Sequence, residues 1–484
     1  MKKMTGRNPT IENRTFDEMS IGDEATLHRV LSRDDILLFA AVSGDVNPAH
    51  VDEEFARSDF FQKIIAHGMW GAALISTVLG TEMPGPGTIY LGQTLRFKRP
   101  VAIGDHIVTT VRVTRKDSEK SRVTLECFCR NQRGEEVIRG EAEVMAPREK
   151  IIRPRKTLPE VKIVERFVRF QELIRLAEPQ PPIRTAVVHP VDRATLANCI
   201  EAHGDHLIIP VLIGPAYKIK AVAEAEGLAI DAFEMIDVAH SHAAAEEAVR
   251  LAEEGLVELI MKGTLSSEEL LGVLNGSMKL RTGRKRTHVH SLDVPTFPRT
   301  LFMTDTELNV TPDIETKTGI VQNAVDLLHA LGRECPRVAI LSAGDLVDLR
   351  MPSTMEAAAL CKMAERNQIR GAMVDGPMPF DIAVSSEAGD SSNCHSAVVG
   401  NADILVVPDM EAGRILVQQL RRLIDASAAG IILGYRVPVI LPGPADNVRT
   451  CEASCALACM WSHYHQEKDA IRIKTPKVRS TPLA

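Results

Sequence analysis

The hydrophobic and polar positions of the first part of the chain predict helices followed by a sheet. Ser32 and Asp35 have the spacing of a capping box, and the apolar segment behind them runs to Val42, which predicts a helix. A second apolar helix is expected to begin at Gly68 and to stop near Gly80. Apolar and polar residues then alternate, as is typical of half-buried strands. Strands are expected at residues 89–97, 105–115, 121–131 and 135–145. The pattern therefore predicts a long helix packed on an antiparallel sheet.

From about residue 166 the pattern changes to short apolar strands that alternate with amphipathic helices. Strands are expected at residues 185–188, 207–213, 337–341, 371–374, 403–407 and 437–441. Helices are expected at residues 243–254, 316–331, 354–366 and 411–425. Such alternation predicts an α/β domain with a mainly parallel sheet and with ligands at the carboxyl ends of its strands.

The two patterns divide the chain into two domains and two connecting or terminal segments. Residues 1–147 form the first domain and residues 166–465 the second. The segment between them, residues 148–165, is rich in Lys, Arg and Pro, which is typical of a solvated linker. The final residues, 466–484, are polar and contain Pro, and we expect them to be loose.

Charge and composition exclude several classes of function. The chain has 484 residues and a net charge of −7 without a long run of one sign, so nucleic acid is not expected as the main partner. No segment approaches the roughly 20 apolar residues that span a bilayer. The first six residues are polar and do not resemble a signal peptide. We therefore expect a cytoplasmic protein without a membrane partner.

The nine cysteines show neither disulfide nor zinc-finger spacing, and we expect reduced thiols. Cys451, Cys455 and Cys459 recur every four residues and would line one stripe of a helix. Their small apolar neighbours favour a tightly packed helix over a metal site. Cys394 and His395 are expected to be an ordinary loop pair. No metal is expected.

One loop of the first domain carries an acidic and a basic side chain that lie close together in the sequence. Residues 43–50 read Ser-Gly-Asp-Val-Asn-Pro-Ala-His, which sets Asp45 and His50 five positions apart. Pro48 is predicted to exclude a helix here, so we expect a loop that turns both side chains toward one point. A carboxylate and an imidazole so placed could activate a water molecule. The alternative is that Asp45 closes a turn and that His50 is structural.

The run Asp-x-Asn-Pro-x-His, followed by Ala-His-Gly-Met at residues 66–69, resembles the MaoC-like (R)-specific enoyl-CoA hydratases. The resemblance continues through residues 84–97 to Gly104 and Asp105. It implies the α+β hot-dog fold and the syn addition of water to a trans-2-enoyl-CoA, which gives an (R)-3-hydroxyacyl-CoA.

The resemblance also implies roles for individual residues. His50 is the expected base, and Asp45 orients the water and shares its proton. Gly68, at the start of the second helix, can present free N–H groups to the thioester oxygen. Substrate-binding or loop-holding side chains are further expected at Asn47, His67 and Gln93.

In the second domain a basic cluster and several Gly- and Pro-rich strand ends could bind phosphate. The cluster consists of Arg281, Arg284, Lys285 and Arg286. A solvated run of charges beside ordinary α/β loops is the alternative explanation.

Longer segments of the second domain look like the phosphate acetyl/butyryltransferases. They include Met261-Lys262-Gly263, Asp293-Val294-Pro295, Asp375-Gly376-Pro377 and Val407-Pro408-Asp409. The resemblance covers residues 166–465 and implies an α/β domain with an interdomain cleft, in which an acyl group moves directly between CoA and phosphate. Arginine would hold the phosphate, a hydroxyl would assist the CoA sulfur, and a carboxylate would orient the thiol. Arg281, Arg284 and Asp446 are the expected substrate-binding residues.

The chain departs from this family at a late motif. The family has Thr-Ser-Arg-Ala-Asp-Ser at a strand end, whereas residues 442–447 read Pro-Gly-Pro-Ala-Asp-Asn. Asp446 remains, but Gly443 and Pro444 replace the hydroxyl and the guanidinium. Losing either group should cost orders of magnitude in rate.

We therefore expect a fusion of an active enoyl-CoA hydratase with a phosphate acyltransferase-like domain whose site is incomplete. The alternatives are a fully bifunctional hydratase and phosphate acetyl/butyryltransferase, or a second domain that only binds acyl-CoA or mediates oligomerisation. The expected partners are acyl-CoA and phosphate. No cofactor is expected beyond the CoA that the substrate carries, and both resemblances imply a homo-oligomer.

Overall fold

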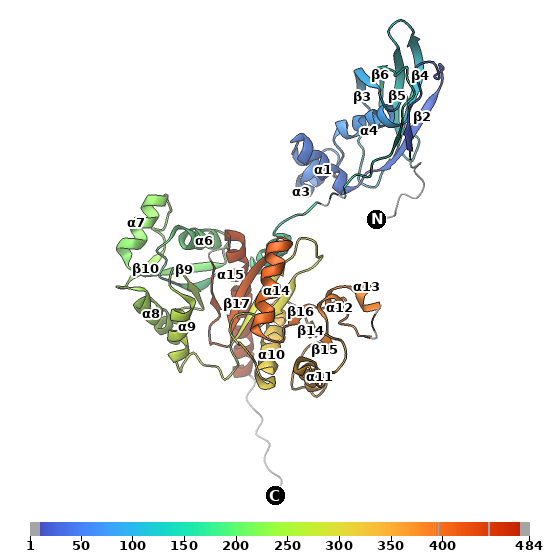
Figure 1. Ribbon diagram of the computed structural model, residues 1–484. Helices are drawn as coiled ribbons and strands as arrows, with labels where there is room; N and C mark the ends of the chain where they lie inside the picture. Colours follow the sequence, from blue (N-terminus) through green and yellow to red (C-terminus); the bar gives the residue numbers. More distant parts are fainter. Residues whose placement is uncertain are drawn as a thin grey trace. The chain divides into compact units, whose positions relative to one another are not determined.

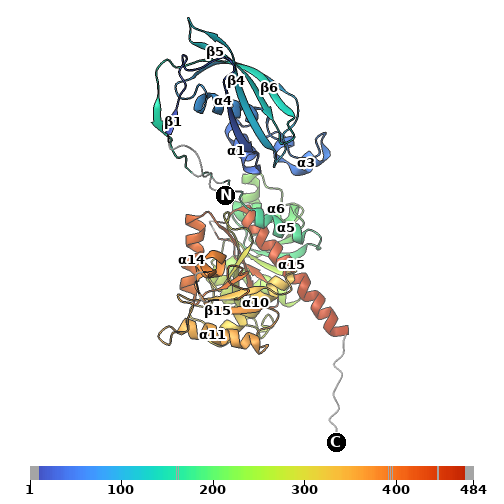
Figure 2. The ribbon, with the colours of Figure 1, turned by 90° about the vertical axis from the view of Figure 1, so that its right-hand side faces the viewer.

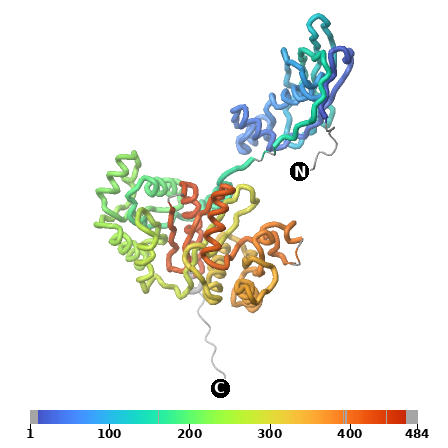
Figure 3. Tube along the Cα trace, viewed as in Figure 1, coloured from blue at the N-terminus to red at the C-terminus, as the bar shows by residue number. Residues whose placement is uncertain are grey.

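A computed structural model describes residues 10–474, apart from residues 160, 162, 391, 393, 395, 444 and 445, and side chains as far as residue 468. The polar first six residues, His395 and Pro444 lie outside this description. The chain divides into two compact units, Met1–Ile163 and Val164–Ala484 (Figure 1, Figure 3). Each unit has hydrophobic clusters of its own. Within the described part of the chain, no helix has the length and apolar character that crossing a bilayer requires.

The first unit is an antiparallel sheet packed against one long helix (Figure 2). The strand order is β2 (Glu24–Val30), β4 (His106–Asp117), β5 (Arg122–Arg130), β6 (Glu136–Met145) and β3 (Ile89–Phe97). Helix α4 (Gly68–Thr81) buries Ile75 and Val78 in the same cluster as Val111 and Leu125 of the sheet. The predicted hot-dog arrangement is confirmed. Strand β2, which lies at one edge of the sheet, was not predicted.

The helix expected after Ser32 is present as α1 (Arg33–Ser43). The Ser32 side chain accepts a hydrogen bond from the main-chain N–H of Asp35, and the Asp35 carboxylate accepts one from the main-chain N–H of Ser32. These reciprocal bonds satisfy two N–H groups that the first turn would leave unpaired, so the predicted capping box is confirmed.

The prediction that Pro48 excludes a helix was wrong for the residues that follow it. Pro48 is the first residue of the short helix α2 (Pro48–Val51), where the missing N–H costs no hydrogen bond. The Asn47 side chain caps this helix by accepting a hydrogen bond from the N–H of Ala49 at 3.1 Å. His50 therefore lies on a helix, with α3 (Glu53–Ser58) directly after it.

Part of the expected linker belongs to the first unit. Strand β7 (Ile152–Pro154) pairs antiparallel with β1 (Thr10–Glu12). The Asn13 side chain donates to the carbonyl oxygen of Glu149 at 2.8 Å and accepts from the N–H of Ile151 at 2.9 Å. These bonds hold the segment up to residue 154 against the start of the first unit.

The second unit is built on an eleven-stranded mixed sheet with the order β10-β9-β8-β11-β18-β17-β12-β13-β16-β14-β15. The strands are β8 (Ile183–Val188), β9 (Ile208–Gly214), β10 (Glu234–Asp237), β11 (Leu259–Lys262), β12 (Thr287–Asp293), β13 (Leu301–Thr304), β14 (Arg337–Leu341), β15 (Met373–Met378), β16 (Ile404–Val406), β17 (Ser427–Leu433) and β18 (Val439–Ile440). All six strands predicted in this region are present, whereas β10, β11, β12, β13 and β17 were not predicted.

The sheet consists of two parallel sets joined by antiparallel strands. Strands β10, β9, β8, β11 and β18 are parallel, as are β13, β16, β14 and β15. Strands β17 and β12 stand between the two sets and pair antiparallel with both of their neighbours. The three antiparallel pairings make the two parallel sets run in opposite directions.

Helices pack on both faces of this sheet. The helices are α5 (Val168–Ala177), α6 (Arg193–Gly204), α7 (Ala216–Glu226), α8 (Ser241–Glu253), α9 (Ser267–Gly276), α10 (Ile314–Ala330), α11 (Pro352–Glu365), α12 (Phe380–Val384), α13 (Ser386–Asp390), α14 (Met410–Leu423) and α15 (Val448–Lys474). Val187 on β8 packs with α5, α6 and α15, whereas its neighbours Ala186 and Val188 pack with α8. This alternation is expected of a strand buried on both faces, and it confirms the predicted α/β domain.

Helix α15 contains the cysteine stripe and changes the expected tail. Cys451, Cys455 and Cys459 are free and fully buried in the core, as the packed-helix interpretation predicted. The helix continues to Lys474, so the prediction of a loose segment from residue 466 was wrong for residues 466–474. Residues 475–484 lie outside the described part of the chain.

Candidate active site

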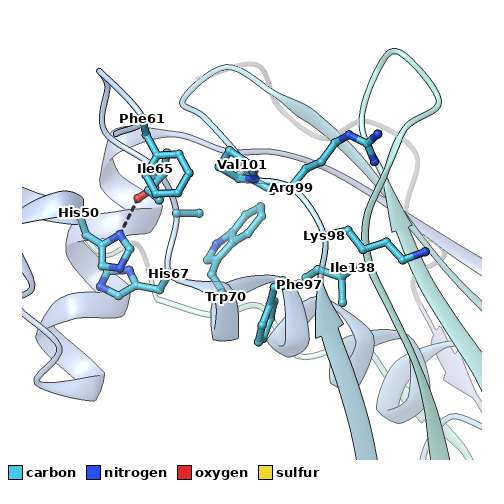
Figure 4. A pocket seen from close by; sticks show the side chains of 14 residues that line it. His50, Phe61, Ile65, His67, Trp70, Phe97, Lys98, Arg99, Val101 and Ile138 are labelled. Carbon is cyan, nitrogen blue, oxygen red and sulfur yellow. Dashed lines mark hydrogen bonds between the residues drawn. The ribbon is translucent and has the colours of Figure 1, made fainter. Parts of the chain in front are cut away.

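A cavity of about 390 Å³ opens in the first unit, with mainly apolar walls (Figure 4). It is lined by His50, Phe61, Ile65, Ala66, His67, Gly68, Trp70, Gly71, Phe97, Lys98, Arg99, Pro100, Val101 and Ile138. Figure 4 shows two imidazole rings on one side of the cavity and the side chains of Lys98 and Arg99 on the other. The cavity can thus hold an apolar group between a titratable end and a cationic end.

The ring of His50 has a defined hydrogen-bonding state. Its Nδ1 lies 2.9 Å from the carbonyl oxygen of Ile65. A carbonyl oxygen can only accept, so in the neutral ring Nδ1 carries the proton and Nε2 keeps the lone pair. His50 can therefore act as a base through Nε2.

His67 lies against His50 and is oriented in a similar way. The two ring centroids are 4.0 Å apart. Nε2 of His67 donates to the main-chain carbonyl oxygen of Asp45 at 2.9 Å. His67 is only 3% exposed, and its Nδ1 is buried without a hydrogen-bond partner among the described residues. Its closest polar contact is thus with the loop that carries the predicted acid, and Phe39 packs on its ring at a centroid distance of 5.0 Å.

Asp45 is exposed and does not line the cavity, but it lies at the edge of the site. One oxygen of its carboxylate and one ring nitrogen each from His50 and His67 lie within 4.8 Å of one another. Its Oδ1 also accepts a hydrogen bond from the N–H of Asn47 at 3.3 Å. The sequence correctly brought Asp45 and His50 together. The Asn47 side chain caps α2 and does not line the cavity.

Gly68 lies on the cavity wall at the first turn of α4, where no side chain caps the helix. The N–H of Trp70 donates to the carbonyl oxygen of His67 at 3.0 Å. The N–H groups of Gly68 and Met69 have no hydrogen-bond partner among the described residues, so they and the positive end of the helix dipole are available to a bound oxygen atom. A Cβ at Gly68 would lie 3.0 Å from the ring of Phe97, and a Cβ at Gly71 would lie 2.2 Å from Cδ1 of Ile138. The two glycines let the first turns of α4 approach the cavity walls closely.

Sequence reasoning placed Gln93 in the site and missed the cationic end of the cavity. Gln93 does not line the cavity, because its amide accepts from the hydroxyl of Tyr90 and donates to the carbonyl oxygen of Thr94 at 3.2 Å. Lys98 and Arg99 follow β3 directly. Lys98 forms an ion pair with the Glu136 carboxylate at 2.6 Å, and Arg99 donates to the main-chain oxygen of Glu136 at 3.1 Å. The Lys-Arg-Pro run after a predicted strand was the available signal.

In the second unit the predicted substrate-binding residues fall into two separate groups. Arg281 donates to the carbonyl oxygen of Asn275 at 2.9 Å. Arg284 donates to Asp326 at 2.6 Å and to Asn323 at 3.3 Å, both on α10. Within the described residues, no hydrogen bond or ion pair joins either arginine to Asp446. The expectation of one site made by all three residues is therefore not supported by their contacts.

Asp446 has a different arginine beside it. Its Oδ1 accepts from Arg421 of α14 at 2.7 Å, and its Oδ2 accepts from the N–H of Gly443 at 2.7 Å. Burial lowers the pKa of Lys262, at the end of β11, while the charges of Asp192 and Asp446 raise it. Because β11 and β18 are parallel neighbours, their carboxyl ends bring Lys262 and Asp446 to the same edge. Sequence reasoning missed Arg421, because it lies 25 positions before Asp446 in the chain. Lys262 is part of the Met-Lys-Gly motif that the sequence analysis quoted.

Ser266, three residues after the Met-Lys-Gly motif, has a local structural role. Its side chain caps α9 by accepting from the N–H of Glu269 at 3.1 Å. Thr306 lies in the core, where its hydroxyl contacts Nδ1 of His290 at 2.8 Å. Burial lowers the pKa of His288 to about 3 and that of His290 well below its usual value, so both rings are neutral. Ser266 thus serves helix capping, and Thr306 serves core packing.

Comparisons with known proteins identify both halves of the chain. A family model described as "MaoC like domain" matches residues 18–127, and one described as "Phosphate acetyl/butaryl transferase" matches residues 245–459. The phosphate acetyltransferase of Rhizobium meliloti is 48% identical over 295 residues, which cover 61% of this chain and 93% of that protein. The phosphate butyryltransferase of Clostridium acetobutylicum is 35% identical over 292 residues, which cover 60% of this chain and 97% of that protein.

Among solved structures, the unliganded R-hydratase PhaJ1 from Pseudomonas aeruginosa is 45% identical and covers 32% of this chain and 99% of its own, with a TM-score of 0.31. The match to the MaoC-like family model covers α1, α4 and most of the sheet of the first unit. The match to the transferase relatives extends over nearly their whole length. The chain therefore belongs to the phosphate acetyl/butyryltransferase family and carries a MaoC-like hot-dog domain before its transferase domain.

Proposed function

We propose that the chain is bifunctional and acts on CoA thioesters in both units. The first unit hydrates a trans-2-enoyl-CoA, and the second transfers an acyl group between CoA and phosphate. The orientation of His50 carries the first assignment, because its Nδ1 proton is bound by Ile65 and its Nε2 lone pair is left for a water molecule. The 48% identity to a phosphate acetyltransferase carries the second assignment.

In the proposed hydration, Nε2 of His50 removes a proton from water while the water oxygen forms a bond to C3 of the enoyl group. The π electrons of the C2–C3 bond move toward the thioester oxygen, and C2 then takes a proton from the pair formed by His50 and Asp45. One water molecule is added in total, and the base returns to its starting state. The resemblance to the (R)-specific hydratases supports syn addition and an (R)-3-hydroxyacyl-CoA product.

The first turn of α4 is the proposed site of the thioester oxygen. Negative charge develops on that oxygen during the reaction, and unpaired N–H groups near Gly68 can stabilise it. Gly68 permits this approach, because a side chain there would meet the ring of Phe97. In other enzymes a single hydrogen-bond donor of this kind lowers the free energy of the transition state by about 3 kcal/mol.

The rest of the cavity fits the acyl chain of the thioester. Trp70 and Ile138 are among the apolar walls that can enclose this chain. No metal or further cofactor enters the proposed reaction, since the imidazole, the carboxylate and the helix N–H groups supply its proton transfers and charge stabilisation.

Hydration is tested with the purified full-length chain and crotonyl-CoA, by following the loss of the conjugated double bond in the ultraviolet. We expect turnover and a 3-hydroxybutyryl-CoA product of (R) configuration. No turnover of crotonyl-CoA or of its longer homologues would contradict the hydratase assignment, and an (S) product would contradict the proposed face of addition.

In the proposed acyl transfer, a phosphate oxygen attacks the thioester carbonyl carbon, the C–S bond breaks, and acyl phosphate and CoA are formed. Arg421 beside Asp446 supplies a guanidinium at the strand end where the family motif has its own arginine. Asp446 can orient the thiol, and Lys262 adds a second cation at the same edge. This arrangement and the identity to the transferases support an active second unit in preference to the incomplete site that Gly443 and Pro444 suggested.

Acyl transfer is tested with acetyl-CoA or butyryl-CoA and phosphate, by measuring released CoA and trapping acyl phosphate with hydroxylamine. The higher identity to a phosphate acetyltransferase than to a phosphate butyryltransferase leads us to expect the faster rate with acetyl-CoA. A working enzyme should reach about 1 per second or more. Release of CoA that does not depend on phosphate, or no transfer at all, would favour a second unit that binds acyl-CoA or mediates oligomerisation.

A further inference from the structure

A large polar cavity lies in the second unit and has no part in the reactions proposed above. Its volume is about 950 Å³. Its walls come from α10, the turn between α11 and β15, the loop before β12, and α15. The lining residues are Arg284, Gln322, Asp326, His329, Arg366, Asn367, Gln368, Arg370, Gly371, His465 and Lys468. It shares none of these residues with the group around Asp446.

The charges in this cavity are strongly unbalanced. Four cationic side chains, Arg284, Arg366, Arg370 and Lys468, face the single carboxylate of Asp326. With its histidines neutral the cavity has an excess of three positive charges, in a chain whose net charge is −7. Cations gathered in a concave site repel each other, and a bound anion relieves this repulsion.

The carboxylate of Asp326 already has hydrogen-bond partners within the cavity. Asp326 accepts from Arg284 at 2.6 Å and from the amide of Gln322 at 3.0 Å. By contrast, Arg366 has no ion pair within 4 Å in the described part of the chain, and the ammonium group of Lys468 lies over the ring of Tyr464 at 4.2 Å. Arg366 and Lys468 thus keep their charge for a ligand.

Hydrogen bonds between side chains and main-chain groups hold the rim of the cavity in place. Gln322 bonds both the N–H and the carbonyl oxygen of Arg370, at 2.8 and 3.2 Å. The Nε2 of His329 donates to the carbonyl oxygen of Gly371 at 2.8 Å. The Nε of Arg370 donates to the carbonyl oxygen of Asn367 at 2.9 Å, which leaves its two terminal nitrogens for a ligand. The guanidinium groups of Arg284 and Arg370 are therefore held in place before a ligand binds.

We propose that this cavity binds a small organic molecule that carries two or more phosphate groups. Guanidinium groups bind phosphate oxygens in pairs, and the amides of Asn367 and Gln368 add neutral donors. The volume is in the range of sites for whole cofactors and exceeds what inorganic phosphate needs. A nucleoside diphosphate or triphosphate and the 3′-phospho-ADP end of CoA share this chemistry. The proposal holds whether or not either unit has the activity proposed above.

The test is isothermal titration calorimetry of the full-length chain at low and moderate salt with ADP, ATP, CoA, dephospho-CoA and inorganic phosphate. The decisive variant carries Arg366→Glu and Arg370→Glu, and the matched control carries Arg422→Glu, an exposed arginine on α14 away from the cavity. We expect one site per chain for at least one of the organic ligands, weakened at least about tenfold in the double variant and retained in the control. The affinity should fall as salt rises.

The set of ligands in the titration distinguishes a free nucleotide from the nucleotide end of CoA. Binding of ADP or ATP that the double variant loses identifies a nucleotide site. If the double variant binds one molecule fewer of CoA and of dephospho-CoA per chain, and its binding of the other ligands is unchanged, the cavity binds the nucleotide end of CoA. An unchanged circular dichroism spectrum shows that the double variant is folded. If the double variant does not fold, a variant with Arg366→Gln and Arg370→Gln is used in its place. Equal binding by the natural chain and the folded variant, or binding of no organic ligand, overturns the proposal.

Discussion

The imidazole of His67 is joined to the main chain of Asp45 by a hydrogen bond of 2.9 Å between Nε2 and the carbonyl oxygen. The same ring packs against His50 at a centroid distance of 4.0 Å. His67 therefore touches both members of the proposed acid–base pair while its own Nδ1 stays buried. This relationship makes it a positioning residue rather than a second base.

Replacing His67 should separate positioning from chemistry. His67→Ala removes the bond to Asp45 and the ring beside His50, and we expect kcat for crotonyl-CoA to fall about 10- to 100-fold, with a smaller change in KM. His67→Gln keeps an N–H donor and should recover part of the loss. His28→Ala, which changes an exposed histidine on β2, is the control. Equal rates for the Ala and Gln variants would mean that the bond to Asp45 has no part in the effect.

Asp45→Asn and His50→Ala should each lower hydration at least about a hundredfold, because each removes a group that holds or moves the proton of the attacking water. Crotonyl-CoA kinetics and circular dichroism of the purified variants provide the measurement. Acyl transfer to phosphate by the same preparations serves as an internal control, since it belongs to the other unit. A variant that keeps near-normal hydration would remove that residue from the mechanism.

Gly71→Ala should narrow the acyl cavity without unfolding the unit. The new Cβ would lie 2.2 Å from Cδ1 of Ile138, so the end of this side chain, which lines the cavity, must shift. Alanine also favours the helix by up to about 1 kcal/mol, which offsets part of the strain. We expect kcat/KM to fall more for a six-carbon than for a four-carbon enoyl-CoA.

The control for this variant is Gly80→Ala, in the same helix with nothing within 4 Å of its Cβ. It should leave the ratio of the two substrates unchanged. Adding Ile138→Val to Gly71→Ala should restore the six-carbon substrate. If the two substrates lose rate equally in Gly71→Ala, the cavity does not hold the acyl chain at Ile138.

Arg421→Ala should lower phosphate-dependent acyl transfer at least about a hundredfold, since its guanidinium lies beside Asp446 where charge develops in the transition state. Arg421→Lys keeps the charge but not the paired donors, and should recover only part of the rate. Arg422→Ala, one position along the same helix and exposed, should be unchanged. Normal transfer by Arg421→Ala would show that another group holds the phosphate.

The elements with a regular apolar period were predictable, whereas β12 was not. Its sequence, Thr-His-Val-His-Ser-Leu-Asp, reads as polar, yet all seven residues are buried. His288 and His290 are tolerated there because burial keeps them neutral and the hydroxyl of Thr306 reaches His290. A partner that lies on another strand cannot be found from local periodicity.

The candidate site was predictable where its residues share one short motif. Asp45 and His50 lie five positions apart, and the structure places them together. Arg421 and Asp446 meet only because α14 and the loop after β18 are neighbours in the fold. Pro48 was misread because a proline that ends one conformation can begin a helix at its first position.

Strand β3 lies at an edge of the sheet in the first unit, and several of its apolar side chains are exposed, with Ile89 at 55% and Phe97 at 53%. Its outer N–H and C=O groups can pair with the same strand of a second copy, which would also cover these side chains. Association would then protect the wall that Phe97 contributes to the cavity, so hydration per chain should decline on dilution below the dissociation constant. Sedimentation at the same concentrations should show the fall in mass that accompanies it, and a constant specific activity across a measured dimer-to-monomer transition would contradict the link.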